Sequence, residues 1–173
     1  YDNNVGGMSG LLQGMQRAGL GQVVFSSSCA TYGVPDSLPI AETTPQRPIN
    51  AYGKSKLAIE QMLGDFANSH GLRPVIFRYF NVAGADPEGE IGEQHLPETH
   101  LIPLMLDAVA GKRPALTLFG TDYPTPDGTC VRDYVHVSDL ARSHVAAAER
   151  MLQGEPLEPV YNLGSGAGVS VRQ

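Results

Sequence analysis

The chain has 173 residues, of which 42% are hydrophobic and 17% charged, and its formal net charge is −6. This composition predicts a globular chain with one ordinary core, and the acidic balance without a Lys/Arg cluster argues against nucleic acid or an anionic membrane as partner. No apolar run reaches about 18 residues and no secretory signal is visible, so no membrane span is expected. Cys29 and Cys130 lie far apart, which favours free thiols in a reducing compartment, the cytoplasm.

The first half of the chain alternates helical and strand-like patterns. Asn3 and Asn4 lead into a helix whose apolar residues have helical spacing: Met8, Leu11, Leu12 and Met15. Strands are predicted over 23–26 and 74–79, with one helix after Tyr52 and another over 101–110. This order is typical of an α/β protein.

The second half predicts short strands over 116–119 and 133–137, and then a helix capped by Ser138 that carries Ala141, Val145, Ala148 and Leu152. The glycines of 164–168 imitate a dinucleotide-binding turn, but their spacing favours a strand-to-helix turn. Ser170 and Gln173 have the spacing of a capping box, so a further helix is expected to begin there. Both ends of the chain are therefore expected to be cut within an element, without the glycine-rich first unit of a dinucleotide fold.

Tyr52 and Lys56 stand four residues apart, downstream of a serine run that ends at Ser28. On a helix the two side chains share one face, and an ammonium beside a phenol is expected to lower its pKa from about 10 towards the range of a general base. Ser28 adds a hydroxyl that can relay a proton. Tyr-x-x-x-Lys alone is more often a surface pair, but together with the serine run it predicts a site that oxidises an alcohol.

Seven segments occur in order along the chain: YDNNV at 1–5, FSSS at 25–28, YGKSK at 52–56, RYFN at 78–81, DYPT at 122–125, VRDYVHV at 131–137 and YNLG at 161–164. This set resembles the extended short-chain dehydrogenase/reductase family, and within it the UDP-glucose 4-epimerases. The resemblance implies the C-terminal part of a Rossmann-like doubly wound parallel sheet with a small α+β substrate-binding subdomain. Residues 1–81 are then half of an NAD-binding domain, and 82–173 are mostly the nucleotide-sugar-binding region.

The resemblance implies an isomerase that interconverts UDP-glucose and UDP-galactose by NAD-dependent oxidation and re-reduction at C4. Tyr52 is implied as the base for the sugar 4-hydroxyl, Lys56 as a ligand of the nicotinamide ribose, and Ser28 as the partner of the 4-oxygen that bridges the proton. Asn3 and Phe80 are implied as further NAD contacts. A helix cap and a core residue are the alternatives for these two.

Six more residues are implied as substrate ligands beside Ser28 and Tyr52: Asn81, His100, Leu101, Leu118, Phe119 and Arg132. A planar guanidinium suits a pyrophosphate, so Arg132 matches the diphosphate clamp, with a surface pair to Asp133 as the alternative. Leu118 and Phe119 match positions beside the uracil. Many relatives carry asparagine at the position of His100, whose side-chain role stays open, although its helix amino terminus can attract an anion.

Other functions remain as alternatives. No metal is expected, because the histidines and glutamates of 93–100 lack a tight ligand spacing. A nucleotide-sugar dehydratase or reductase is disfavoured, since dehydratases carry Asp-Glu where Cys29 and Ala30 follow Ser28. UDP-sugars with an N-acetylhexosamine or a pentose, and a non-catalytic nucleotide-sugar-binding module, are further possibilities.

The resemblance also implies how the protein assembles, and the exposed sheet edge bears on whether the chain folds alone. A homodimer of the full-length protein is expected, through the helix near Asn4 and the helix that carries Tyr52. The isolated chain is expected to be inactive, to retain no NAD and not to fold stably, because the edge of its sheet is exposed.

Overall fold

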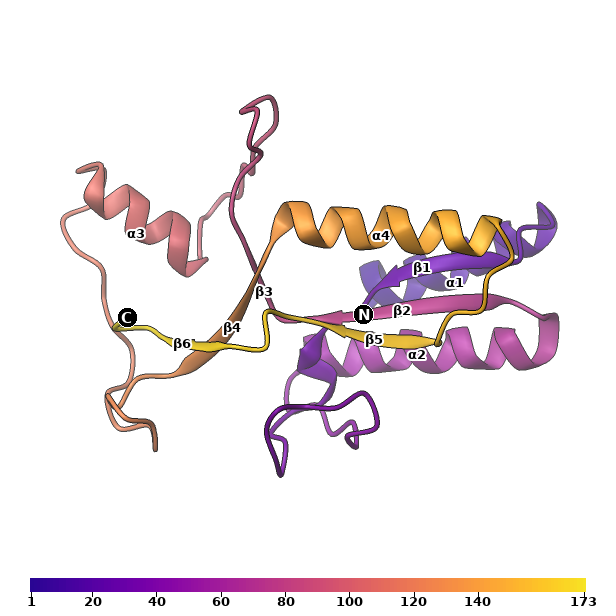
Figure 1. Ribbon diagram of the computed structural model, residues 1–173, viewed down its shortest axis with the longest axis horizontal. Coiled ribbons are helices and arrows are strands. Elements are labelled where there is room, and N and C mark those ends of the chain that lie inside the picture. Colours follow the sequence, from indigo (N-terminus) through magenta and orange to yellow (C-terminus); the bar gives the residue numbers. More distant parts are fainter.

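A computed structural model describes all 173 residues. Its main sheet holds three parallel strands, β1 (Gln22–Ser26), β2 (Arg73–Tyr79) and β5 (Val160–Leu163), in the order β1-β2-β5. Parallel neighbours need a long crossover, and the helix α2 (Ala51–His70) provides it between β1 and β2. The predicted α/β class with a parallel sheet is confirmed (Figure 1).

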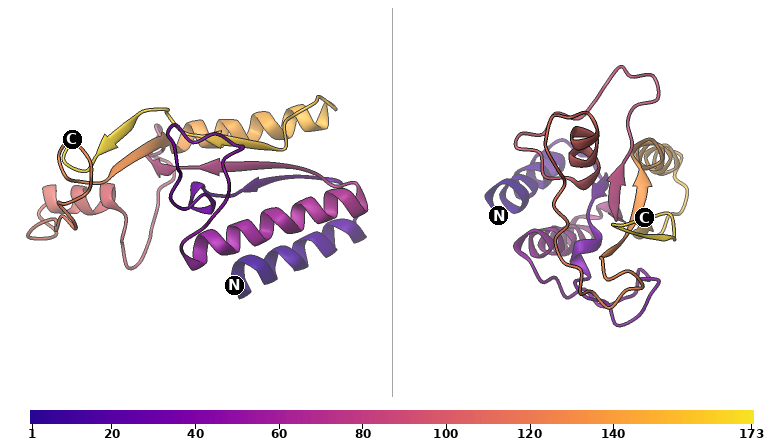
Figure 2. Two further views of the ribbon diagram at one scale, coloured as in Figure 1. Left: turned by 90° about the horizontal axis from the view of Figure 1, so that it is seen from below. Right: turned by 90° about the vertical axis from the view of Figure 1, so that its left-hand side faces the viewer.

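Helices cover both faces of the main sheet (Figure 2). α1 (Gly7–Arg17), preceded by a π-helical turn at Asp2–Gly6, packs with α2 on one face, and α4 (Val137–Leu152) packs on the other. The core under α1 and α2 consists of Met8, Leu12, Met15, Phe25, Ile59, Leu63, Leu72 and Ile76. The core under α4 consists of Val75, Phe77, Ala147 and Met151. Side chains of β2 alternate between the two cores, as a strand period of two requires.

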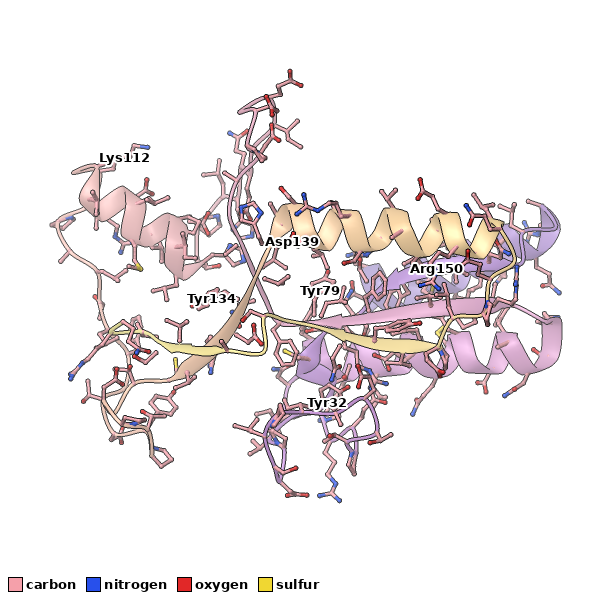
Figure 3. The ribbon with its side chains drawn as sticks, viewed as in Figure 1. Tyr32, Tyr79, Lys112, Tyr134, Asp139 and Arg150 are labelled. Atoms are coloured by element: carbon pink, nitrogen blue, oxygen red, sulfur yellow. The ribbon has the colours of Figure 1, made fainter.

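A second lobe extends from the carboxyl ends of the main strands. β3 (Asn81–Ala83) pairs with β4 (Val131–His136) in parallel, and β6 (Gly168–Ser170) pairs with β4 antiparallel. α3 (Leu101–Val109) also belongs to this lobe and buries no residue, and Figure 3 shows side chains projecting outward from it. Hydrogen bonds from Ser170 and Thr129 lower the pKa of Asp127 to about 2, which ties the loop before β4 to β6.

Three predictions for the strand over 116–119 and for α4 are wrong. Residues 116–119 pair with no strand and have no regular structure. Ser138 does not cap α4, because His136 is the N-cap and its Nδ1 accepts from the Ser138 backbone N–H at 3.2 Å. The predicted apolar stripe of α4 is exposed, and the residues that face the sheet are Leu140, His144, Ala147 and Met151.

The glycine-rich segment 164–168 leads from β5 to the strand β6 and not to a helix. Its turn is held by Asp133, whose carboxylate accepts from the backbone N–H groups of Ser165 at 2.7 Å and Gly166 at 3.0 Å. At Ser170 half of the predicted capping box is present, since the Gln173 side chain accepts from the Ser170 N–H at 2.9 Å. The Ser170 hydroxyl donates to Asp127 instead, and residues 171–172 form a turn.

Helices long and apolar enough to cross a membrane are absent.

Candidate active site

The sequence motifs converge at the carboxyl edge of the main sheet. The serine turn, Ser26–Ser28, lies at the end of β1, Phe80 follows β2, and Gly164 follows β5. In open parallel sheets, ligands bind outside this edge, where side chains from successive strands meet. The topology therefore places the predicted catalytic residues where a ligand-binding crevice is expected.

The serine turn meets α2 through the Ser26 carbonyl and the side chains of Ser27 and Ser28, whereas the Ser26 hydroxyl lies 2.8 Å from His144 Nε2 on α4. Lys56 Nζ donates to the Ser26 carbonyl oxygen at 2.9 Å, the Ser27 hydroxyl donates to Glu60, and the Ser28 hydroxyl interacts with Tyr52. Because Tyr52, Lys56 and Glu60 are spaced by four residues, they share one helix face. The structure thus brings Ser28, Tyr52 and Lys56 together.

The close approach of α2 to the serine turn depends on a glycine. Asn50 caps α2 and accepts from the Gly53 backbone N–H at 2.7 Å. A Cβ built on Gly53 would lie only 2.4 Å from the Ala30 carbonyl oxygen. Ala30 belongs to the short 3₁₀ turn Cys29–Thr31, which is fixed by a hydrogen bond from the Ala30 N–H to the Ser28 hydroxyl at 3.2 Å. Any larger residue at position 53 would push the helix away from Ser28.

Burial shifts the pKa values of both Tyr52 and Lys56. Burial raises the pKa of the half-exposed Tyr52, and Tyr79 adds to this effect while the contact with Ser28 opposes it. Burial also lowers the pKa of Lys56, whose Nζ lies 5.7 Å from the Tyr52 ring centroid. The expectation that the pKa of Tyr52 lies below its usual value is therefore wrong for the ligand-free chain. The ammonium is directed to the Ser26 carbonyl, and desolvation of the phenol dominates.

Arg132 on β4 lies within electrostatic reach of the serine turn, since its charge opposes the rise that burial causes in the Cys29 pKa. Its Nη1 donates to the Val131 carbonyl at 2.9 Å, and Arg132 forms no ion pair with Asp133. The alternative of a surface pair is thereby excluded, and the guanidinium keeps donors for an anionic ligand.

The Phe80 ring and the Asp133 carboxylate both lie close to the Gly164 backbone. A Cβ on Gly164 would lie 3.0 Å from the Phe80 ring and 2.6 Å from the Asp133 carboxylate. Phe80 is half-buried at the edge of the main sheet and belongs to neither of the two core clusters. Asn81 opens β3 and is exposed. Both residues are thus available to a ligand at this edge.

The remaining predicted ligands lie apart from this cluster. Asn3 is exposed inside the π-helical turn and does not cap it, since Tyr1 is the N-cap. His100 is the exposed N-cap of α3, and its Nδ1 lies 2.8 Å from Glu98. The second lobe also carries three predicted apolar ligands, namely Leu101 at the start of α3, the half-buried Leu118 and the 83% exposed Phe119.

Three potential metal ligands come together although their sequence spacing did not predict it. The ligand atoms of His95, Glu98 and His100 all lie within 4.8 Å of one another. Glu98 Oε1 already accepts from the backbone N–H groups of Thr99 at 2.8 Å and His100 at 2.7 Å, as well as from the His100 ring. These hydrogen bonds hold the cluster together without a cation, so it is not included in the candidate site.

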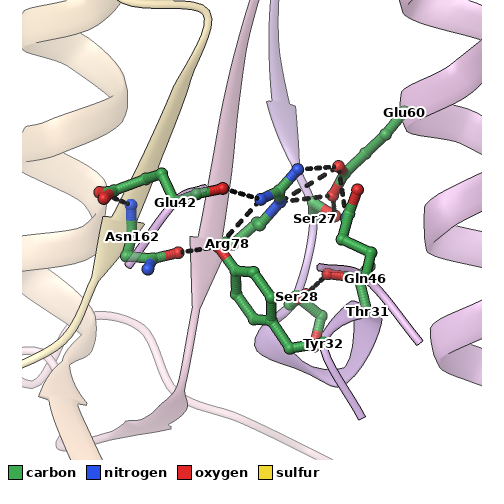
Figure 4. A network of polar contacts seen from close by, with 9 residues as sticks. All are labelled: Ser27, Ser28, Thr31, Tyr32, Glu42, Gln46, Glu60, Arg78 and Asn162. Carbon is green, nitrogen blue, oxygen red and sulfur yellow. Dashed lines mark hydrogen bonds and ion pairs between the residues drawn. The ribbon is translucent and has the colours of Figure 1, made fainter. Parts of the chain in front are cut away.

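A buried polar network behind the serine turn was not found by sequence reasoning. It contains Glu60 on α2 and Arg78 on β2, and Figure 4 shows them between Ser27 and Tyr32. The available signal was a charged residue within each of two otherwise core-forming elements: Glu60 follows Lys56 by four residues on the catalytic face of α2, and Arg78 interrupts the apolar run of β2.

Comparison with known proteins places the chain in a family. Residues 1–164 match the model of the NAD dependent epimerase/dehydratase family, and the chain belongs to that family. The UDP-glucose 4-epimerase of Rhizobium meliloti (strain 1021) is 55% identical over all 173 residues, and that of Streptococcus mutans is 53% identical over 170 residues. The matched stretches are 52% and 51% of these two proteins, so the chain spans about half the length of the curated relatives.

Solved structures show the same relationship. The UDP-glucose 4-epimerase from Brucella ovis in complex with NAD aligns with a TM-score of 0.94 at 54% identity, over 99% of this chain and 53% of that one. The enzyme from Bifidobacterium longum in complex with NAD⁺ and UDP aligns with a TM-score of 0.89 at 40% identity, over 99% and 52% of the two chains. The Rossmann-like architecture expected from the sequence is confirmed by these neighbours.

Proposed function

We propose that this chain is part of a UDP-glucose 4-epimerase, an isomerase that interconverts UDP-glucose and UDP-galactose in galactose metabolism. The observation that carries the proposal is the contact between the serine turn and α2, with Ser28 beside Tyr52 and Lys56 bound to Ser26. Support comes from relatives of that name at 55% identity over the whole chain. The proposed division at residue 81, into half of an NAD-binding domain and a region that is mostly nucleotide-sugar-binding, is supported by the second sheet, which starts with β3 at Asn81, while β5 returns to the main sheet.

The proposed chemistry needs a hydride acceptor and a base on the same sugar carbon. NAD⁺, when bound, accepts the C4 hydride and returns it to the opposite face of the 4-keto sugar. Tyr52 takes the proton of the 4-hydroxyl, while the Ser28 hydroxyl binds the 4-oxygen and bridges the transfer. Lys56 holds the nicotinamide ribose and keeps a cation near the phenol. A bound nicotinamide in its oxidised form would supply a second positive charge, which would oppose the rise that burial causes in the Tyr52 pKa.

The residues at the sheet edge fit a dinucleotide. Lys56 offers a half-buried ammonium and Phe80 a half-buried ring beside Gly164, where the backbone can be closely approached. Asn3 completes the proposed NAD contacts from the turn before α1, which packs against α2.

The proposed substrate is a UDP-hexose, with most of the binding free energy on the nucleotide so that the sugar can turn over. Arg132 is the proposed diphosphate ligand, because its guanidinium lies near the serine turn and is not paired with a carboxylate. The other proposed ligands are Asn81, His100, Leu101, Leu118 and Phe119.

A neighbouring reaction is disfavoured by the serine turn itself. Elimination of water from the sugar needs additional acid and base groups, and the residues after Ser28 are Cys29 and Ala30. Burial raises the pKa of the Cys29 thiol, which therefore lacks the thiolate character of a good base. Epimerisation needs no group beyond Ser28, Tyr52 and Lys56.

We further propose a homodimer of the full-length protein in the cytoplasm. Two free thiols, Cys29 and Cys130, support a reducing compartment. On α1, Leu11 is 51% exposed, which leaves an apolar side chain for a partner at the helix that was expected to pair.

The test is to incubate the full-length protein with UDP-galactose, without added cofactor, and to follow UDP-glucose by NMR. Conversion supports the proposal together with retained NAD. Accumulation of a dehydrated or reduced sugar would move the assignment to a neighbouring branch. Parallel assays with UDP-N-acetylgalactosamine and UDP-arabinose define the sugar, and turnover of none of these would favour a binding module.

A further inference from the structure

The interior between α2 and the main sheet contains a buried ion pair. Glu60 and Arg78 are 7% and 5% exposed, and Arg78 Nη2 donates to Glu60 Oε2 at 2.6 Å while Nε lies 3.1 Å from both carboxylate oxygens. Desolvation makes such pairs a weak source of stability, and apolar residues of similar size are often as stable. Stability of the fold therefore does not by itself explain why an ion pair occupies this position.

The ion pair is connected to residues on both sides of Ser28 (Figure 4). On one side, the Ser27 hydroxyl donates to Glu60 and the Ser27 N–H donates to the Phe77 carbonyl at 2.8 Å. On the other side, Arg78 Nη1 donates to the Tyr32 hydroxyl at 2.9 Å, and Tyr32 closes the 3₁₀ turn that follows Ser28. Both chain segments that leave Ser28 are thus held by the same two charged groups.

The same pair also fixes the helix that carries the proposed base. Glu60 lies eight residues after Tyr52 and four after Lys56, on the helix face that meets the serine turn. A carboxylate held by three donor residues resists rotation or sliding of α2: Ser27, Arg78 and Gln46, the last at 2.8 Å. All buried side-chain polar atoms of the structure have hydrogen-bond partners, so this network has little freedom to rearrange.

We propose that Glu60 and Arg78 are positioning residues, which set the separation between the Ser28 and Tyr52 hydroxyls by fixing the serine turn and α2 to one ion pair. This inference rests on the proposed function. Both residues are buried behind the serine turn and act through Ser27 and Tyr32. A misplacement of about 1 Å at a catalytic group costs on the order of 10²-fold in rate. The ion pair therefore fixes the relative positions of Ser28 and Tyr52. Its loss is expected to lower kcat more than it weakens substrate binding.

The test uses the full-length protein with Glu60→Gln, Arg78→Lys and Ser27→Ala. Ser27→Ala removes only the link between the ion pair and the serine turn. It therefore tests the proposal even if Glu60→Gln or Arg78→Lys does not fold. We expect each variant to lower kcat for UDP-galactose by about tenfold or more, with KM changed less than threefold. Met151→Ala, in the core under α4, is the matched control, which is expected to lower Tm with little change in kcat.

A second readout does not depend on turnover. Ultraviolet difference titration, with Tyr52→Phe subtracted, gives the pKa of Tyr52 in each variant. Displacement of Ser28 removes the contact that opposes the rise in this pKa, so titration is expected at higher pH than in the wild type. Wild-type kcat with unchanged titration in folded variants would overturn the positioning role. A wild-type protein that fails to convert UDP-galactose while its variants still shift the titration would overturn only the proposed function.

Discussion

At the scale of single residues, the Lys56 ammonium lies near the Tyr52 phenol without a hydrogen bond to it. Lys56 Nζ is held by the Ser26 carbonyl at 2.9 Å and lies 5.0 Å from the Phe25 ring centroid. This arrangement keeps the cation close to Tyr52 while leaving the phenol free for a sugar hydroxyl. Because burial raises the pKa of Tyr52, the base form needs nearby positive charge to be populated at neutral pH.

Removal of that charge has a defined pH signature. In Lys56→Met, the pKa of Tyr52 rises further, so the rising limb of kcat against pH is expected to move to higher pH, with kcat at pH 7 reduced by roughly 10²-fold or more. Lys54→Met is the matched control, since Lys54 lies on the same helix but is exposed. If the rising limb of kcat against pH stays in place in Lys56→Met, the proposed electrostatic role of Lys56 is contradicted.

At the scale of elements, α2 meets the serine turn through one glycine. Gly53→Ala would place a Cβ 2.4 Å from the Ala30 carbonyl oxygen, so α2 has to move away from Ser28. We expect kcat to fall by about tenfold or more, because a small displacement at the catalytic groups has a large effect on rate.

Gly64→Ala is the matched control on the same helix, because a Cβ there has nothing within 4 Å. Ala favours a helix over Gly by about 1 kcal/mol, so this variant is expected to unfold at a higher temperature and keep its kcat. Equal kcat for the two glycine variants would show that the close approach at Gly53 is not required.

At the scale of the whole molecule, the chain leaves much apolar surface and one sheet edge uncovered. β1 pairs only with β2, so its other edge has unpaired backbone groups. Only 22 of the 173 residues are buried, and side chains such as Val109 and Leu152 are 87% and 81% exposed. We expect such a chain to bury too little apolar surface to offset its conformational entropy.

The 173-residue chain expressed alone is therefore expected to aggregate, to show no cooperative thermal transition and to retain no NAD. Circular dichroism during heating, with NAD assayed after denaturation, measures both properties. The full-length protein is the control and is expected to unfold cooperatively. A sharp transition in the isolated chain would contradict this expectation.

The sequence predicted β1 and β2 and singled out Ser28, Tyr52 and Lys56 because these features depend on local signals. The apolar runs of β1 and β2 and the four-residue spacing of Tyr52 and Lys56 are properties of short segments. The exposed stripe of α4 was chosen wrongly because two alternative apolar faces exist on that helix, and only the sheet selects the one with Ala147 and Met151.

The buried network was not predictable for a related reason. The partners in the Glu60 and Arg78 pair are 18 residues apart and meet only through tertiary packing. The pKa of Tyr52 likewise depends on burial, which spacing along a helix does not reveal.

The most direct test of Tyr52 as the base is the rate at which the full-length protein with Tyr52→Phe converts UDP-galactose. Loss of the base is expected to lower kcat by roughly 10²- to 10⁴-fold with little change in KM. Tyr161→Phe serves as the control and is expected to retain its rate, because the Tyr161 hydroxyl only accepts from the Glu158 backbone N–H at 2.8 Å. Equal rates for Tyr52→Phe and the wild type would contradict the assignment of Tyr52 as the base.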